Sequence, residues 1–210
     1  PFRVITAEEV KSLWPLVELG NGGDTANIVG ALYHPDDGHI APADLTMALR
    51  KGARMRGAEI YEQTEVTNAV QLPSGEWKLT TSRGEVTCEH VVCATGNYAR
   101  QTGKMFGINV PAIPVEHQYI VTDQHPAIME RRAQGLPEMG VLRESDSSWY
   151  MREEAGGLLL GPYEIGAPAC YVDGPAANSE YELFPDALDR LMPYIETAIA
   201  NQITFFVWIS

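Results

Sequence analysis

The feature that most constrains the fold is a continuous apolar run, His90-Val-Val-Cys-Ala-Thr-Gly96, which ends at a glycine. A strand of a parallel sheet that is buried on both faces has a continuous apolar sequence. A strand with one face exposed to solvent has alternating apolar and polar residues. A helix is predicted directly afterwards, over 98–106. A second strand is predicted at 58–64, after a helix that begins near Pro42 and ends near Gly57. This order predicts an α/β domain that binds a nucleotide at the carboxyl ends of its strands.

Other local signals surround this framework. Thr6 and Glu9 have the spacing of a capping box, which predicts a short helix to about residue 15. A strand is predicted over 28–33. Three further short strands are predicted at 66–71, 77–82 and 84–87.

The character of the chain changes after residue 115. Antiparallel strands are predicted over 117–122, 148–152 and 157–161, around a polar insert rich in Glu and Arg. Apolar residues at helical spacing predict a helix over 185–200. The predicted fold class is therefore α/β plus α+β.

Charge narrows the range of partners. The chain has 15 Lys and Arg against 28 Asp and Glu, a net charge of −13. Nucleic acids and anionic membranes need clustered cations, so neither is an expected partner. No apolar run approaches the roughly 20 residues that span a bilayer. Three cysteines without CxxC spacing favour a reducing compartment, either the cytoplasm or, in a eukaryote, the mitochondrial matrix.

Two histidines flank a short acidic segment, His34-Pro-Asp-Asp-Gly-His39. Imidazoles and carboxylates this close together are potential metal ligands. Turn chemistry alone explains every residue of the segment, and we favour that interpretation. No metal site is predicted.

A second group of polar residues lies in the predicted antiparallel strands. Side chains alternate along a strand, so His117 and Tyr119 share one face, and Tyr150 and Arg152 share another. Together they would form a wall suited to an amino-acid carboxylate and a proton. An ordinary half-exposed sheet explains the same pattern equally well.

Several motifs together resemble a known family. In their order and spacing they resemble the dimethylglycine and sarcosine dehydrogenases, glycine-oxidase-like FAD-dependent amine oxidoreductases of the D-amino-acid oxidase superfamily. The motifs are Tyr33-His-Pro-Asp-Asp-Gly-His-Ile-Ala-Pro42, Leu45-Thr-Met-Ala-Leu49, Cys93-Ala-Thr-Gly96, Gly103-Lys-Met105, Ile113-Pro-Val-Glu-His-Gln-Tyr119, Tyr150-Met-Arg152 and Leu159-Leu-Gly-Pro-Tyr-Glu164.

The resemblance implies a function and a domain organisation. An N-methylated amino acid would give a hydride equivalent to FAD, and the resulting iminium would be hydrolysed or passed to tetrahydrofolate on a domain outside this chain. Residues 38–115 would belong to a Rossmann-like FAD-binding domain. Residues 1–37 and 116–210 would belong to an antiparallel-sheet substrate domain.

The resemblance also implies residue roles. His117 and Tyr150 match the family's catalytic pocket residues, and Tyr119 and Arg152 would bind substrate. Residues near the cofactor would be Val66, Ala94, Thr95, Gly96 and Tyr98, the last of which stands where the family usually has Trp.

The chain departs from the family in one important respect. It contains no GxGxxG, so we expect an internal fragment of a longer protein with an incomplete FAD site. We expect the fragment alone to be inactive and to self-associate through exposed sheet edges. A non-catalytic truncated homologue that acts as a small-molecule or protein-interaction module is the alternative.

Overall fold

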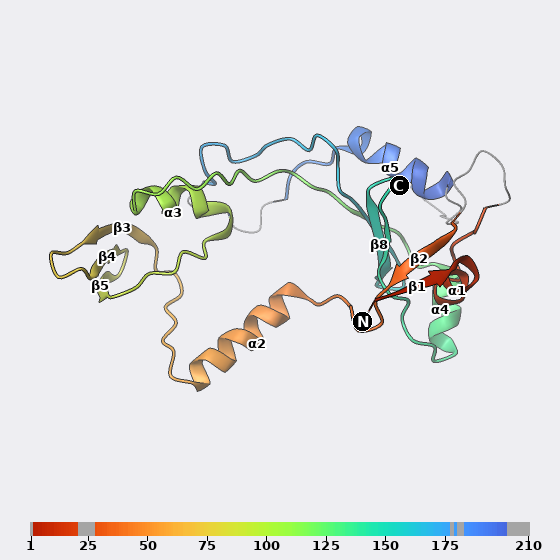
Figure 1. Cartoon of the computed structure of the whole chain (residues 1–210), viewed down its shortest axis with the longest axis horizontal. Coiled ribbons are helices and arrows are strands. Elements are labelled where there is room, and N and C mark those ends of the chain that lie inside the picture. Colours follow the sequence, from red (N-terminus) through yellow and green to blue (C-terminus); the bar gives the residue numbers. More distant parts are fainter. Residues whose placement is uncertain (1, 21–27, 177–178, 180–182, 201–210) are drawn as a thin grey trace. The chain divides into compact units, whose positions relative to one another are not determined.

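The chain folds into two compact units, each built from separate stretches of sequence. A computed structural model describes residues 2–20, 28–176, 179 and 183–200. Unit 1 comprises residues 1–39, 117–167 and 184–210, and unit 2 comprises residues 40–116 and 168–183 (Figure 1). All strand pairs in the described residues are antiparallel. The chain is thus a mixture of helices and antiparallel sheets, which confirms the predicted fold class at this coarse level.

A four-stranded sheet forms the centre of unit 1. Its order is β6 (Ile120–Val121), β9 (Gly157–Pro162), β8 (Trp149–Glu154) and β7 (Leu142–Glu144). Strand β8 alternates strictly between buried and half-buried residues, as expected for a sheet with one face on the core. The two central strands lie close to the predicted ranges. Strand β6 is shorter than predicted, and β7 was not predicted.

A smaller sheet and a capped helix complete the N-terminal part of unit 1. Strand β1 (Arg3–Thr6) pairs with β2 (Gly30–Tyr33), and helix α1 (Ala7–Leu13) follows β1. The Thr6 hydroxyl accepts from the Glu9 amide at 3.3 Å, and the Glu9 carboxylate accepts from the Thr6 amide at 3.0 Å. The predicted capping box is therefore confirmed.

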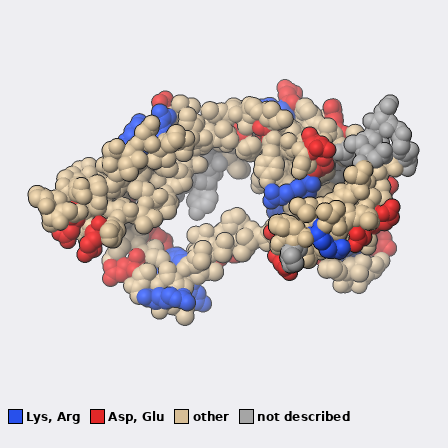
Figure 2. Space-filling view, in the orientation of Figure 1, with Lys and Arg blue, Asp and Glu red and all other residues tan. Residues whose placement is uncertain are grey.

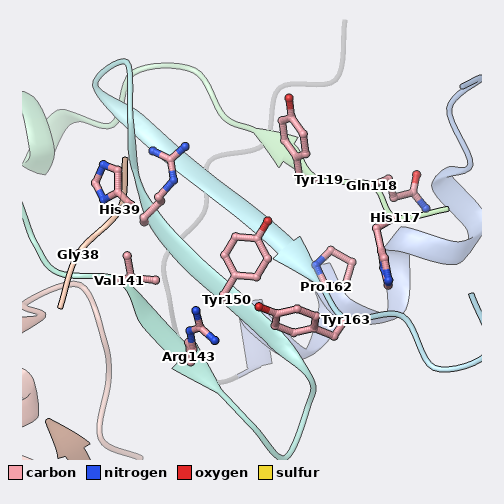
Figure 3. A pocket seen from close by; sticks show the side chains of 11 residues that line it. Gly38, His39, His117, Gln118, Tyr119, Val141, Arg143, Tyr150, Pro162 and Tyr163 are labelled. Carbon is pink, nitrogen blue, oxygen red and sulfur yellow. The ribbon is translucent and has the colours of Figure 1, made fainter. Parts of the chain in front are cut away.

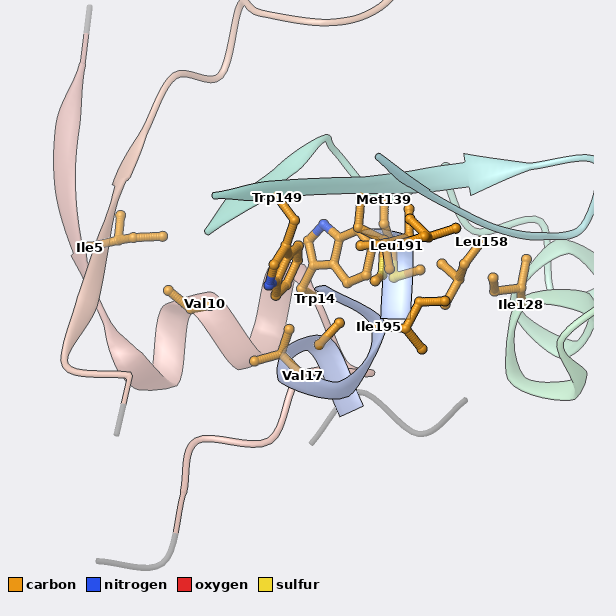
Figure 4. Packing of buried hydrophobic residues seen from close by; sticks show 13 residues of the cluster. Ile5, Val10, Trp14, Val17, Ile128, Met139, Trp149, Leu158, Leu191 and Ile195 are labelled. Atoms are coloured by element: carbon orange, nitrogen blue, oxygen red, sulfur yellow. The ribbon is translucent and has the colours of Figure 1, made fainter. Parts of the chain in front are cut away.

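The core of unit 1 lies between the four-stranded sheet and several helices, including α1 near the start of the chain and α5 near its end (Figure 4). Helices α4 (Pro126–Ala133) and α5 (Leu188–Ala200) contribute to it. The Trp14 indole N–H donates to the Gly140 carbonyl at 2.7 Å, so its only polar atom is satisfied. The buried apolar residues are Ile5, Val10, Trp14, Val17, Ile128, Met139, Trp149, Met151, Leu158, Leu160, Leu191, Ile195 and Ala198.

Unit 2 contains a helix and a three-stranded meander. Helix α2 (Pro42–Met55) has proline in its first turn, as predicted, and buries none of its residues. The meander has the order β3 (Val66–Gln71), β4 (Trp77–Thr81) and β5 (Gly84–Cys88). These three strands confirm the short strands predicted from the sequence.

A helical corner follows the meander. A single 3₁₀ turn (Gly96–Tyr98) leads into helix α3 (Ala99–Met105), close to the predicted helix. The Arg100 guanidinium donates to the Val172 carbonyl at 2.6 Å. An isolated bridge pairs Val115 with Ala169. These contacts explain why residues 168–183 belong to unit 2, which the sequence did not indicate.

Two predicted strands are wrong as elements of this structure. Residues 58–64 and 90–95 have strand-like sequences, yet neither stretch forms a strand. A strand exists only when a neighbour completes its hydrogen-bond ladder, and the described residues supply no such neighbour to either stretch. Val92, in the middle of the apolar run, is consequently 88% exposed.

The excess of acidic over basic residues is visible on the surface of the protein. Figure 2 shows acidic side chains on the surfaces of both units. Within the described residues, no helix is both long and apolar enough to cross a bilayer.

Candidate active site

A cavity of about 370 Å³ lies on the face of the four-stranded sheet opposite the core (Figure 3). Strand β8 explains this placement, because its buried residues Trp149 and Met151 face the core while Tyr150 and Arg152 face away. His117 and Tyr119 line the same cavity. The four residues predicted as catalytic or substrate-binding are therefore neighbours around one cavity. The others that line it are Gly38, His39, Gln118, Val141, Arg143, Pro162 and Tyr163.

Gln118 fixes the segment that carries His117 and Tyr119. Its amide group donates to the Ala187 carbonyl at 3.0 Å and accepts from the Ala187 amide at 3.3 Å. This paired contact ties the extended segment to the residue that precedes α5. Figure 3 shows Gln118 directed toward the helix, and the residues before and after it are exposed beside the cavity.

The Tyr150 ring has a fixed place in the cavity. Tyr150 pairs across the sheet with Gly161, and a Cβ built on Gly161 would overlap the Tyr150 ring and hydroxyl. The ring therefore lies across the bare backbone of Gly161. The Tyr163 ring packs beside it, with 5.5 Å between centroids. The Tyr150 ring can pack flat against strand β9 because residue 161 is glycine.

Burial raises the pKa of Tyr150 above its ordinary value of 10.0, and the neighbouring Tyr163 adds to the rise. Tyr119 acts in the same direction, while Arg152 and Arg143 oppose it. The net direction is upward, so the hydroxyl remains protonated at neutral pH. Tyr150 can therefore donate a hydrogen bond to an anion or to a lone pair in the cavity.

The basic side chains around the cavity differ in their partners. The Arg152 guanidinium lies 2.6 Å from the Glu154 carboxylate and donates to the Glu153 carbonyl at 3.0 Å. The His39 imidazole lies 3.8 Å from the Glu138 carboxylate. Arg143 is exposed on β7, directly across the strand pair from Tyr150.

Two buried carboxylates hold the walls of the cavity in place. Glu153, with its side chain 2% exposed, accepts from the Met139 amide at 2.9 Å and from Arg132 at 3.3 Å. Glu164 accepts from two nitrogens of Arg190, at 2.9 and 3.5 Å, and so ties the end of β9 to α5. A buried carboxylate must be paired in this way, because burial of a bare charge is expensive.

The residues predicted near the cofactor all lie in unit 2. Val66 begins β3, and Ala94, Thr95 and Gly96 are exposed at the corner before α3. Gly96 has φ +54°, and a Cβ built on it meets nothing within 4 Å. The Tyr98 hydroxyl donates to the Ala176 carbonyl at 3.3 Å. Because glycine has no side chain, a large ligand could approach the exposed backbone closely at this corner.

Sequence reasoning missed seven residues of the cavity, among them Arg143, Tyr163 and His39. Arg143 lies in what was predicted to be a polar insert, because the three-residue strand β7 is too short to show a period. Tyr163 follows Gly161 by two residues and shares its face, a signal that the period of a strand could have given. His39 is predicted as a residue beside the turn at 35–38, and that interpretation did not place it next to the polar strands. In the described part of the chain, no cluster of three or more potential metal ligands occurs.

Known proteins similar to this chain include several dehydrogenases. The family described as FAD dependent oxidoreductase (DAO) matches residues 1–207. The chain is 38% identical to mitochondrial dimethylglycine dehydrogenase of Mus musculus, over 93% of this chain and 22% of that protein. It is 29% identical to mitochondrial sarcosine dehydrogenase of Mus musculus, over 94% of this chain and 20% of that protein.

A solved structure shows the same fold. The crystal structure of L-proline dehydrogenase from P. horikoshii matches with a TM-score of 0.66 and 25% identity, over 94% of this chain and 47% of that chain. The two dehydrogenases of Mus musculus are much longer than this chain, which covers 22% and 20% of their lengths, or about a fifth. These similarities confirm the family predicted from the sequence motifs.

Proposed function

Because this chain belongs to the family of FAD-dependent oxidoreductases, we propose that it is part of a flavoenzyme that oxidises an N-methylated amino acid. Dimethylglycine and sarcosine are the substrates proposed first, since the relatives named above are dehydrogenases of these two compounds. The observation that carries the proposal is the shared cavity of His117, Tyr119, Tyr150 and Arg152. Its side chains include an imidazole that could accept the proton of the amine, and hydroxyl and guanidinium donors that could bind the carboxylate.

His117 would handle the proton of the substrate. An amine is protonated at neutral pH, and its lone pair becomes available only after that proton leaves. An imidazole is the side chain best suited to proton transfer near neutral pH. His117 is exposed on the cavity wall, and no hydrogen bond to its ring nitrogens is present in the described residues. It is therefore available to a ligand.

Tyr150 would orient the substrate. Its hydroxyl remains protonated, since its pKa is raised by burial. Its ring is held between Gly161 and Tyr163, so the hydroxyl occupies a defined position. Tyr119 and Arg152 would complete the substrate wall. A pre-positioned donor costs less entropy on binding than a mobile one.

FAD, when bound, would accept one hydride equivalent, that is two electrons and a proton, from the carbon next to the substrate nitrogen. Unit 2 would hold part of it, and the corner at Ala94, Thr95 and Gly96 fits a close backbone approach to a cofactor. Val66 and Tyr98 would lie beside the same cofactor. The chain lacks GxGxxG, so we propose that a segment outside this chain supplies the rest of the site.

This proposal also assigns the units. Residues 38–115, which form most of unit 2, would be part of a Rossmann-like FAD-binding domain in the longer protein. The two irregular stretches at 58–64 and 90–95 would pair there with strands from outside this chain. Residues 1–37 and 116–210 would belong to the substrate domain. The mitochondrial matrix is the proposed location in a eukaryote and the cytoplasm in a bacterium.

A direct test is anaerobic reduction of the flavin in the full-length protein. Dimethylglycine and sarcosine are mixed with the oxidised holoenzyme, and the loss of visible flavin absorbance is followed. Bleaching by either amine, and no bleaching by glycine, supports the proposal. A protein that binds no flavin, or whose flavin is not reduced by any N-methylated amino acid, would favour the non-catalytic alternative.

A further inference from the structure

We propose that Arg143, rather than Arg152, is the residue that recognises the carboxylate of the ligand in this cavity. The proposal rests on the proposed function for the identity of the substrate. The binding argument itself depends only on the described side chains. It concerns a residue on β7 that the family motifs do not include.

The position of Arg143 is the first part of the argument. Arg143 and Tyr150 are directly opposite each other on β7 and β8, so their side chains rise from the same face. Residues opposite each other on neighbouring strands have Cβ atoms about 5 Å apart. Figure 3 shows the Arg143 guanidinium beside the Tyr150 and Tyr163 rings. The Tyr150 ring itself lies over Gly161 on β9, so a ligand that extends across this ring toward β7 is within reach of Arg143.

The second part is that Arg143 is available. In the described residues it makes no hydrogen bond and no ion pair. Arg152 differs, because its guanidinium is already engaged by the Glu154 carboxylate and the Glu153 carbonyl. An arginine that holds an internal carboxylate has fewer donors left for a ligand.

The third part is the scarcity of cations. The chain carries 28 acidic and 15 basic residues. In the described residues, every other arginine donates to a carboxylate or to a backbone carbonyl, so Arg143, which does neither, stands out from the rest. The planar guanidinium offers two parallel donors that match a carboxylate. A ligand carboxylate at Arg143 would also meet the Tyr150 hydroxyl, a protonated donor. Two donors of different chemistry would thus converge on one anion.

The test measures binding separately from oxidation. Methoxyacetate keeps the carboxylate of dimethylglycine and replaces its nitrogen by an ether oxygen, so it binds without being oxidised. It is titrated into the full-length holoenzyme by calorimetry. The variants are Arg143→Gln and Arg143→Lys, and the matched control is Arg83→Gln, which removes one positive charge at the exposed turn between β4 and β5.

We expect Arg143→Gln to weaken methoxyacetate binding by about 10- to 100-fold, the usual range for a charge-assisted contact. Arg143→Lys should recover part of the loss, and Arg83→Gln should match wild type. N,N-dimethylglycinamide, which has no carboxylate, should be oxidised equally well by wild type and Arg143→Gln. Thermal unfolding of each variant shows whether the fold is retained.

Two results would overturn the proposal: equal methoxyacetate affinity in Arg143→Gln and Arg83→Gln, or no methoxyacetate binding by wild type. The proposed function fails differently. A wild-type protein that binds methoxyacetate through Arg143, yet is not reduced by any N-methylated amino acid, would contradict that function and support the carboxylate site.

Discussion

The Tyr150 ring lies across the backbone of Gly161, its cross-strand partner, in the space that any Cβ at position 161 would occupy. The pair couples the sheet to the cavity, because a glycine of β9 sets the direction of a tyrosine ring of β8. A methyl group at 161 would have to displace the ring.

Gly161→Ala should therefore destabilise the full-length protein by about 1–3 kcal/mol, the usual cost of overpacking. Urea unfolding measures this. Gly140→Ala is the matched control, since a Cβ at Gly140 meets nothing within 4 Å. In a Tyr150→Ala background the effect of Gly161→Ala should largely vanish. Equal losses in both backgrounds would mean that the ring is not the obstacle.

His117→Asn should slow flavin reduction by the amine far more than it weakens FAD binding. The imidazole promotes loss of the amine proton, and losses of about 10²–10⁴-fold are typical of general acid–base groups. Stopped-flow reduction of the holoenzyme across a pH series is the measurement. An unchanged reduction rate at every pH would remove His117 from the mechanism.

Tyr150→Phe removes only a hydroxyl and retains the ring packing over Gly161. The pKa of Tyr150 is raised above 10.0, so the neutral hydroxyl should persist through and above pH 10 in the folded protein. We expect the variant to bind substrate about 10-fold more weakly at neutral pH, as for loss of one hydrogen bond.

The same variant should also lose the decline in substrate binding that wild type shows as the pH rises through the raised pKa. The sign follows from the direction of the shift, since the neutral donor is present below that pKa and absent above it. Substrate titrations at a series of pH values measure this. Identical affinities and pH profiles would reduce Tyr150 to a packing residue.

Glu153→Ala should cost about 1.5–3 kcal/mol of unfolding free energy, because the Met139 amide would be left without its buried acceptor. Glu153→Gln keeps an acceptor oxygen and should cost less. Glu130→Ala, an exposed position on α4, serves as control and should lie within about 0.5 kcal/mol of wild type. Chemical denaturation distinguishes the three. A Glu153→Ala protein as stable as the control would show that another group satisfies the amide.

The 210-residue chain expressed alone should retain no tightly bound FAD and should self-associate. It lacks the GxGxxG motif that binds the pyrophosphate in dinucleotide-binding domains. Its apolar run around Val92 is exposed and unpaired. Visible absorbance after removal of excess FAD, together with light scattering, tests both points. A monomer that keeps stoichiometric flavin would contradict both expectations.

Local signals predicted local structure well in this chain. The capping box at Thr6, the proline start of α2 and the meander from 66 to 88 depend on neighbouring residues, and the sequence contains all of them. The strands predicted at 58–64 and 90–95 failed for the opposite reason. Their pairing depends on strands that the described residues do not supply.

In the cavity too, features that depend on neighbouring residues were predicted, and features that depend on contacts between strands were not. The period of two along β8 placed Tyr150 and Arg152 on one face correctly. Sequence could not show that Arg152 would be engaged by Glu154 while Arg143 stayed available, because that depends on side-chain geometry across strands. The three-residue strand β7 is too short for its period to be recognised.

The hydrogen bond between Trp14 and Gly140 links residues 126 positions apart, and this separation affects how the protein is made. On a ribosome that adds 5–20 residues per second, Trp14 would wait about 6–25 s for its acceptor to be synthesised. Its remaining core neighbours on α5 appear later still. The nascent chain must therefore keep the core side chains of its N-terminal segment, Val10 and Trp14, exposed while unit 2 emerges. Slow folding is the expected consequence of a unit built from distant stretches of sequence.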